Sequence, residues 1–261
     1  MNARAAVLGV VLALAGCGAE SPYVPPPLTG EPTPFKPPEE AWARVLKAGV
    51  DPQGRVDFTA VLVDHADLDR YVAWIYERSP ESWPDLYRTR AHVVAYHVNA
   101  YNALALYNLI QSGVPESLSL MDRKRFFERR KLFVGGQLMS LQEYRENVIR
   151  NLGEPRMHFA LTSLLGSDPR LAKESYRAAT LDQQLDRAAR SFFAEERNLK
   201  VDHASRTIRL SPILSTYAQD FLKVAPSLTA YANRFLDAPL PADYVVEFAD
   251  FDWTVYRQPL R

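Results

Sequence analysis

The chain has 261 residues, of which 47% are hydrophobic and 24% are charged, which is an ordinary composition for a globular protein. Its 31 basic side chains balance 31 acidic ones, and no long basic block occurs anywhere in the sequence. Because nucleic-acid binding surfaces need a local excess of basic residues, the composition argues against DNA or RNA as a partner.

The first 16 residues have the features of an export signal. Arg4 is the only charged residue before an apolar run that ends at residue 15, and this run is too short to span a bilayer, which takes roughly 20 residues. The run leads into the sequence LAGC, which resembles the lipobox of bacterial lipoproteins. We therefore expect residues 1–16 to be a signal peptide, Cys17 to be lipidated, and the protein to be anchored in the cell envelope, facing the periplasm.

Cys17 is the only cysteine in the chain, so the domain that follows it has no thiol for a disulfide, for zinc binding or for nucleophilic catalysis. Gly18 rather than Asp follows the cysteine, and by resemblance to lipoprotein sorting rules this favours the outer membrane. Prolines fill 8 of the 18 positions from 21 to 38, which predicts an extended tether over residues 17–38, with a protein-binding segment as the alternative. Residues 39–261 have no second break of this kind and are expected to form one globular domain.

Helical patterns dominate this domain, because apolar residues recur at helical spacing in six stretches. Two pairs with capping-box spacing, Ser140 with Glu143 and Thr180 with Gln183, mark helix starts. The expected helices cover residues 39–47, 68–77, 87–112, 141–151, 181–196 and 212–222.

Strands are expected to be fewer. Gly135 and Gly136 separate two short apolar runs, and residues 199–211 alternate on both sides of a polar turn, so each stretch predicts a hairpin. Further strands are expected at residues 157–161, at 244–251 and in the closing stretch 251–259, which carries Trp253 and Tyr256. The expected fold class is α+β, a mostly helical single domain with a small antiparallel sheet.

The expected helix at 87–112 is apolar on nearly every side, which is typical of a central, buried helix. Asn99 and Asn102 interrupt it. A buried amide without a partner costs about 1–3 kcal/mol, so each of these side chains must hydrogen-bond something specific. The interpretation that we favour is the backbone of a neighbouring loop, and the alternative is a ligand.

A second polar group follows in the sequence PRMHFAL. Arg156 and His158 are two residues apart there, and on a strand both side chains would point to the same face. We identify His158 as the candidate catalytic histidine and Arg156, with Asn99 and Asn102, as candidate ligand-binding residues. Ser163 is the nearest hydroxyl nucleophile, but strand alternation would put it on the opposite face from His158.

Five segments of the chain, spread over residues 40–258, resemble motifs of the domain of unknown function 547 family in the same order. The first is AYHVNAYNALAL, which resembles the family's F-W-I-N-x-Y-N-A motif. The next two are FVGGQLMSLQEYRENVIR, similar to its glycine hairpin and following helix, and EPRMHFALTS, similar to its D-P-R-I-H-F-A-L segment. The last two are SPILSTYAQDF and FADFDWTV, similar to its L-P-x-x-x-x-W/Y-x-x-D-F and Y-D-W motifs. Bacterial members of the family are often exported, in keeping with the lipobox.

The chain departs from the family pattern at several positions. The family commonly has Trp at position 97, a Glu-His pair at 145 and 146, Asp at 154, and cysteines near 163 and 168. The residues in this chain are His97, Arg145, Glu146, Glu154, Ser163 and Asp168. These differences remove residues that could act as a nucleophile or a base. The resemblance therefore implies that this chain keeps the fold of the family but has lost its catalytic residues.

A polar helix followed later by a histidine segment is loosely like the order in papain-like and transglutaminase-like folds, an analogy of order alone. Such an enzyme would need a thiolate near Asn99 or Asn102, and the domain has none. We therefore expect an envelope lipoprotein whose domain binds an envelope protein or a small ligand without catalysis. The alternative is a papain-like or transglutaminase-like hydrolase or acyl/amide transferase that uses His158.

The sequence predicts neither a metal nor another cofactor. No two of the five histidines stand two or four residues apart, as paired ligands on a strand or helix would. The glycine pair in VGGQ lacks the third glycine and the following lysine of a phosphate-binding loop.

Overall fold

The computed structural model describes residues 38–259. The expected signal peptide, Cys17 and all but the last residue of the tether lie outside the described residues. The α-helices are α1 (Glu39–Gly49), α2 (Phe58–Val63), α3 (Ala66–Glu77), α4 (Arg90–Gln111), α5 (Leu120–Lys124), α6 (Leu141–Glu143), α7 (Leu181–Ala194), α8 (Pro212–Thr216), α9 (Ala218–Leu222) and α10 (Leu228–Ala232). The strands are β1 (Leu132–Val134), β2 (Gln137–Met139), β3 (Leu199–Asp202), β4 (Thr207–Leu210) and β5 (Val245–Phe248).

Shorter helical segments join these elements. Two are π-helical, η2 (Arg125–Arg129) and η3 (Tyr144–Ile149). The others are 3-10 turns, namely η1 (Pro84–Leu86), η4 (Arg150–Leu152), η5 (Pro155–Phe159), η6 (Ala178–Thr180) and η7 (Asn233–Phe235). The mostly helical α+β architecture expected from the sequence is confirmed. Within residues 38–259, no helix is both long and apolar enough to cross a bilayer.

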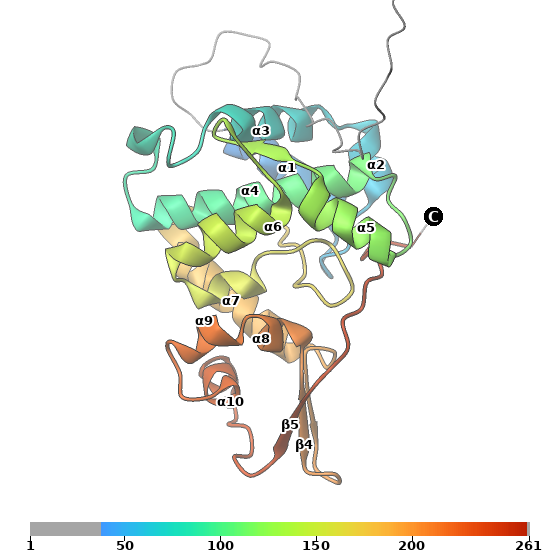
Figure 1. The fold of residues 1–261 in the computed structure, drawn as a ribbon, viewed down its shortest axis with the longest axis vertical. Helices are drawn as coiled ribbons and strands as arrows, with labels where there is room; N and C mark the ends of the chain where they lie inside the picture. Colours follow the sequence, from blue (N-terminus) through green and yellow to red (C-terminus); the bar gives the residue numbers. More distant parts are fainter. Residues whose placement is uncertain (1–37, 260–261) are drawn as a thin grey trace, which may run out of the picture.

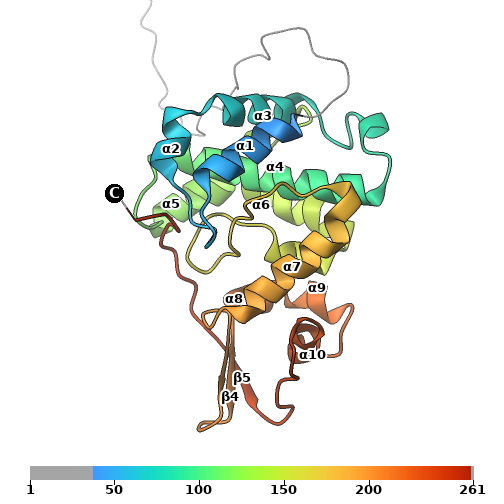
Figure 2. The ribbon, with the colours of Figure 1, turned by 180° about the vertical axis from the view of Figure 1, so that it is seen from behind.

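α4 is the central helix, and every residue from Val94 to Leu109 is buried. Its first turn is held by Thr89, whose hydroxyl accepts the backbone N–H of His92. α1 and α3 pack together above it, and α6 with η3 lies below it (Figures 1 and 2). This burial on all sides confirms the expectation for the helix and leaves its asparagines without access to bulk water.

The buried apolar side chains form two clusters. The larger one surrounds α4 and includes Trp42, Leu104 and Tyr144. The smaller one is centred on Phe159 and is covered by α7, β4 and the short helices α8–α10 (Figure 1). Phe251 packs against both clusters, so the segment after β5 joins the two halves of the core.

The two hairpins expected from the sequence are both present. β1 and β2 pair antiparallel around Gly135 and Gly136, whose φ angles of +57° and +83° lie in the left-handed region that favours glycine. β3 and β4 also pair antiparallel, but β5 joins β4 in parallel. The β1–β2 sheet is thus a small antiparallel sheet, as expected, whereas the three-stranded sheet is mixed.

The closing stretch 251–259 does not form the strand that its alternation predicts. After β5 it runs back along the molecule to the side of α5 (Figures 1 and 2) and makes only isolated bridges, such as Thr254 with Ser117 and Val255 with Leu165. The backbone N–H of Leu118 donates to the carbonyl of Trp253 at 3.0 Å. The end of the described chain is thus attached to the loop before α5.

The helix starts were predicted with mixed success. Ser140 and Glu143 form the expected capping box, in which each side chain accepts the other residue's backbone N–H. Thr180 precedes α7 without capping it, because its hydroxyl donates to the Gln184 side chain instead. The helix expected at 212–222 is divided at Tyr217 into α8 and α9.

Replacing Ser140 by alanine should lower the free energy of unfolding by about 1 kcal/mol, because the backbone N–H of Glu143 loses its acceptor at a buried helix start. Urea denaturation measures the change. Ser205→Ala, in the exposed β3–β4 turn, is the control and should stay within about 0.5 kcal/mol of the wild type. Equal effects of the two substitutions would contradict the capping role.

Candidate functional site

Two of the three buried asparagines of α4, Asn99 and Asn102, bind the backbone of distant loops. Asn102 donates to the carbonyl of Ala160 and accepts the N–H of Thr162, each at 2.9 Å. Asn99 makes the same pair of bonds to the carbonyl and N–H of Tyr176, at 2.8 and 2.9 Å. The interpretation favoured from the sequence, a neighbouring loop, is confirmed for both amides. Direct contact of either amide with a ligand stays a prediction.

The loop held by Asn102 is unusual because all nine of its residues, 161–169, are buried. A buried loop has to satisfy its backbone inside the protein. Here Ser163 donates its N–H to the Asp168 carboxylate at 2.9 Å, and the carbonyl of Leu164 accepts the N–H of Tyr256 at 2.7 Å. Leu164 itself has a φ of +65°, a strained conformation for a side chain of this kind. Strain of this sort, kept in place by many bonds, is concentrated at functional loops.

The strand expected at residues 157–161 is wrong, because η5 occupies residues 155–159. Pro155 starts this 3-10 turn and the Glu154 side chain caps it. With three residues per turn, Arg156 and His158 point in different directions rather than to one face. Arg156 pairs with three carboxylates, those of Glu154 at 2.9 Å, Asp182 at 2.7 Å and Asp186 at 2.8 Å.

His158 points the other way, into a buried polar network, and is only 4% exposed. Its Nε2 lies 3.0 Å from Asp220 Oδ2, and its Nδ1 lies 3.4 Å from a guanidinium nitrogen of Arg145. Its ring stacks on that of Tyr217 with 4.2 Å between centroids.

Burial lowers the pKa of His158 to about 4, although the hydrogen bond to Asp220 acts in the opposite direction. The imidazole is therefore neutral at pH 7, with Nε2–H donating to Asp220 and Nδ1 accepting from Arg145. Hydrogen bonds from His158 and Arg150 hold the pKa of the Asp220 carboxyl well below its usual range. Both ring nitrogens of His158 are thus used inside the protein.

Arg145 also lines a cavity of about 540 Å³, which we call the Arg145 cavity. α4, η2, η3, the buried loop and the closing stretch all contribute to its wall, and these elements can be followed in Figure 1. The polar and aromatic side chains that matter most for its chemistry are Tyr101, Arg145, Ser163, Asp168, Tyr217 and Trp253.

The charge of Arg145 is not neutralised by a direct ion pair. Arg145 is 6% exposed, and among residues 38–259 no carboxylate pairs with it. Its guanidinium carbon lies 4.2 Å from the centre of the Tyr217 ring, and its Nε is buried without a hydrogen-bond partner. A buried charge without a partner costs several kcal/mol, on the order of 3–5 where a pair has been broken. The wall of this cavity therefore contains a buried guanidinium without a direct counter-ion.

Burial also shifts the pKa values of two other residues that line the cavity, Asp168 and Tyr101. Burial raises the pKa of the Asp168 carboxyl, against the opposing effect of the Arg145 charge. Burial also raises the pKa of Tyr101, whose hydroxyl lies 3.1 Å from Ser163 Oγ. Tyr101 therefore holds its proton at neutral pH and is a poor base for the serine.

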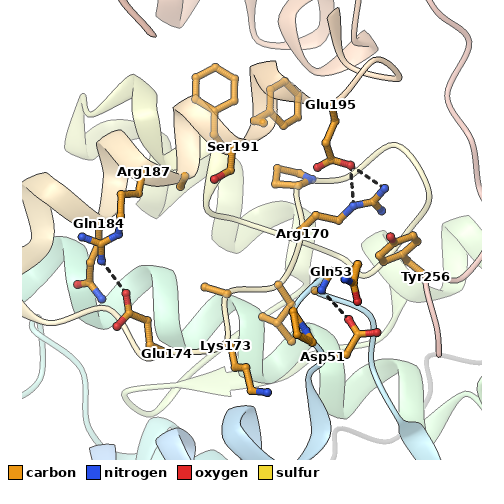
Figure 3. A pocket seen from close by; sticks show the side chains of 18 of the residues that line it. Asp51, Gln53, Arg170, Lys173, Glu174, Gln184, Arg187, Ser191, Glu195 and Tyr256 are labelled. Carbon is orange, nitrogen blue, oxygen red and sulfur yellow. Dashed lines mark hydrogen bonds and ion pairs between the residues drawn. The ribbon is translucent and has the colours of Figure 1, made fainter. Parts of the chain in front are cut away.

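A larger cavity, of about 770 Å³, lies beside α7 (Figure 3). It differs from the Arg145 cavity in the ion pairing of its arginines. There Arg187 pairs with Glu174 at 2.6 Å and Arg170 pairs with Glu195 at 2.8 Å. One nitrogen of Arg170 is buried without a hydrogen bond, but its guanidinium charge is compensated by this pair. Both of these arginines thus have a direct ion pair, which Arg145 lacks.

Sequence reasoning did not group the residues of the Arg145 cavity. One signal was present, since Arg145, Ser163 and Asp168 are all positions at which the chain departs from the pattern of the family it resembles. Tyr217 stands at the W/Y position of the motif that SPILSTYAQDF resembles, but no signal placed it beside Arg145, because the two residues are far apart in the chain. Among the described residues, no group of three His, Cys, Asp or Glu side chains could hold a metal ion.

A comparison with protein-family models supports the central part of the resemblance. The match covers α4, the first hairpin, η3, η5, the buried loop and most of α7. The motifs at residues 211–221 and 248–255 lie beyond it. No curated protein and no solved structure matches the chain. Residues 87–193 match the family model described as "Protein of unknown function, DUF547".

Proposed function

We propose that this chain is a lipid-anchored envelope protein whose folded domain binds a small ligand or a partner protein without catalysing a reaction. The signal-like residues 1–16 and the lipobox cysteine Cys17 support export and anchoring. Gly18 supports the outer membrane as the destination. Residues 17–38 would serve as the tether between the anchor and the domain.

The state of His158 is the observation that carries the non-enzymatic part of this proposal. A general base needs a nitrogen within reach of the proton that it removes. In His158 both nitrogens are engaged, with Asp220 and with Arg145, and the ring is buried. In the described residues, the side chain that hydrogen-bonds the Ser163 hydroxyl is Tyr101, which keeps its proton at neutral pH and is a poor base. These contacts favour binding over the alternative of a hydrolase or transferase.

The proposal places binding in the Arg145 cavity. Its volume falls within the range of about 300–1,000 Å³ that is usual for small-molecule sites. Asn102 would support binding through the buried loop that it holds, since Ser163 and Asp168 reach the cavity from that loop. Asn99 and Arg156 would act from outside the cavity, by holding the chain at Tyr176 and by joining η5 to α7.

Photocrosslinking in the intact envelope tests this proposal. Leu120 lines the cavity and is 65% exposed, whereas Val63 on α2 is 83% exposed and serves as the control position. A photoreactive amino acid at position 120 of the full-length, lipidated chain should give a discrete adduct that mass spectrometry identifies. The same probe at position 63 should not give it. Identical adducts at both positions would contradict binding at the cavity.

Replacing Cys17 by serine should move the protein from the membrane pellet to the soluble fraction, because the serine cannot be acylated at the lipobox. Cell fractionation followed by immunoblotting measures the distribution. Ser21→Ala, in the expected tether, is the control and should remain in the pellet. If the Cys17→Ser protein still sediments with membranes, the anchor is not at this residue.

A further inference from the structure

We infer that the Arg145 cavity binds a small organic anion, a carboxylate joined to an aromatic or branched apolar body, with the carboxylate at the Arg145 guanidinium. This inference rests on the proposed binding function and gives it a ligand class. The charge, the walls and the backbone of the cavity each support it.

The charge favours an anionic group. Arginine presents a planar set of N–H donors that matches a carboxylate, and Arg145 is buried with its Nε unpaired. Glu146, which also lines the cavity, is engaged by Arg150. Asp168 accepts the N–H of Ser163 and forms no ion pair with Arg145 in the described part of the chain. The guanidinium therefore has no direct carboxylate partner in the described residues, and its Nε lacks an acceptor.

The walls favour an apolar body. Phe251 and Trp253 lie with 4.3 Å between ring centroids, and Phe127 approaches Trp253 edge-on at 6.4 Å. All three line the cavity, and Tyr217 adds a further ring next to Arg145. Aromatic walls of this kind stack on flat or branched apolar groups. One ligand with a carboxylate at one end could use both parts of the cavity.

The backbone around the cavity also points to a binding site. The π-helical turns η2 and η3 contribute Phe127 and Arg145, respectively. Such turns are rare and are frequent at functional sites. The strained residue Leu164 directly follows Ser163, which lines the cavity. These backbone features are independent of the charge of Arg145.

Matched pairs of acids and amides test the ligand class. The probes are 3-phenylpropanoate with 3-phenylpropanamide and indole-3-acetate with indole-3-acetamide, titrated calorimetrically into the full-length chain. Each acid should bind at least about tenfold more tightly than its amide, because only the acid pairs with the guanidinium. Arg145→Gln should remove this preference, and Arg145→Lys should retain part of it. Arg187→Gln, in the other cavity, should behave as the wild type.

The outcomes separate the ligand class from the binding function. Equal binding of acid and amide, lost in Trp253→Ala, would overturn the anion inference and leave binding at the cavity standing. A preference for acids that persists in Arg145→Gln would also overturn it. If none of the four probes binds at about 1 mM, the inference fails, and crosslinking at position 120 still decides separately whether the cavity has a partner. Thermal melting of each variant reports whether it is folded.

Discussion

Replacing Asn102 by leucine should lower the free energy of unfolding by about 3 kcal/mol, although leucine is similar in size and more hydrophobic. The substitution leaves two buried backbone groups without partners, the carbonyl of Ala160 and the N–H of Thr162. Neither group can reach water, because Ala160 and Thr162 are both buried. Urea denaturation, monitored by circular dichroism, measures the loss.

Asn151→Ala is the matched control for this prediction. The Asn151 amide is exposed and donates only to the carbonyl of Asn147 within its own helical segment. Its removal should change the free energy of unfolding by no more than about 0.5 kcal/mol. A loss of under about 1 kcal/mol for Asn102→Leu would show that the buried loop does not depend on this amide.

Lowering the pH from 7.5 to 4.5 should reduce the free energy of unfolding by about 2.5 kcal/mol through His158 alone. Burial lowers the pKa of this imidazole to about 4 in the folded protein, from 6.5 in the unfolded chain. Between these two values the unfolded chain binds a proton that the folded protein does not. The stabilisation is therefore complete above pH 6.5 and is lost as the pH falls towards 4. Denaturation at a series of pH values measures the slope.

His158→Gln should remove most of this slope between pH 6.5 and 4.5, whatever its effect on stability at pH 7. The groups that face His158 are Asp220, Arg145 and Arg150. Of these only Asp220 titrates in acid, and since its pKa is lowered, its own contribution is lost below the unfolded value of 3.8. His203→Gln, in the exposed β3–β4 turn, should keep the wild-type slope. An unchanged slope in His158→Gln would show that the histidine is not held neutral.

The parts of the fold that could be predicted from the sequence are those that depend on local signals. α4 was predictable because its apolar residues continue for several turns, and the first hairpin because Gly135 and Gly136 supply a left-handed turn between apolar runs. The strand at residues 157–161 was predicted wrongly. Its alternation resembled a strand, but the sequence Glu154-Pro155 before it starts a 3-10 turn.

The buried loop and the cavity could not be predicted, because they depend on contacts between distant segments. The backbone of the loop at 161–169 is bound by residues from distant segments, among them Asn102, Arg197 and Tyr256. Arg145 lies on a helical segment whose sequence suggests an ordinary exposed cation. Its burial depends on Tyr217, which no local pattern connects with it. His158 was identified as a functional candidate, but its partners on both ring nitrogens became visible only in the structure.

The closing stretch determines when the Arg145 cavity can be completed during synthesis of the chain. Phe251 and Trp253 are among the last described residues, whereas Tyr101 and Arg145 are made far earlier. A nascent or prematurely terminated polypeptide that stops before Phe251 carries Arg145 but lacks two of the aromatic rings that line the cavity. The wall of the cavity is therefore completed only after the closing stretch has been made.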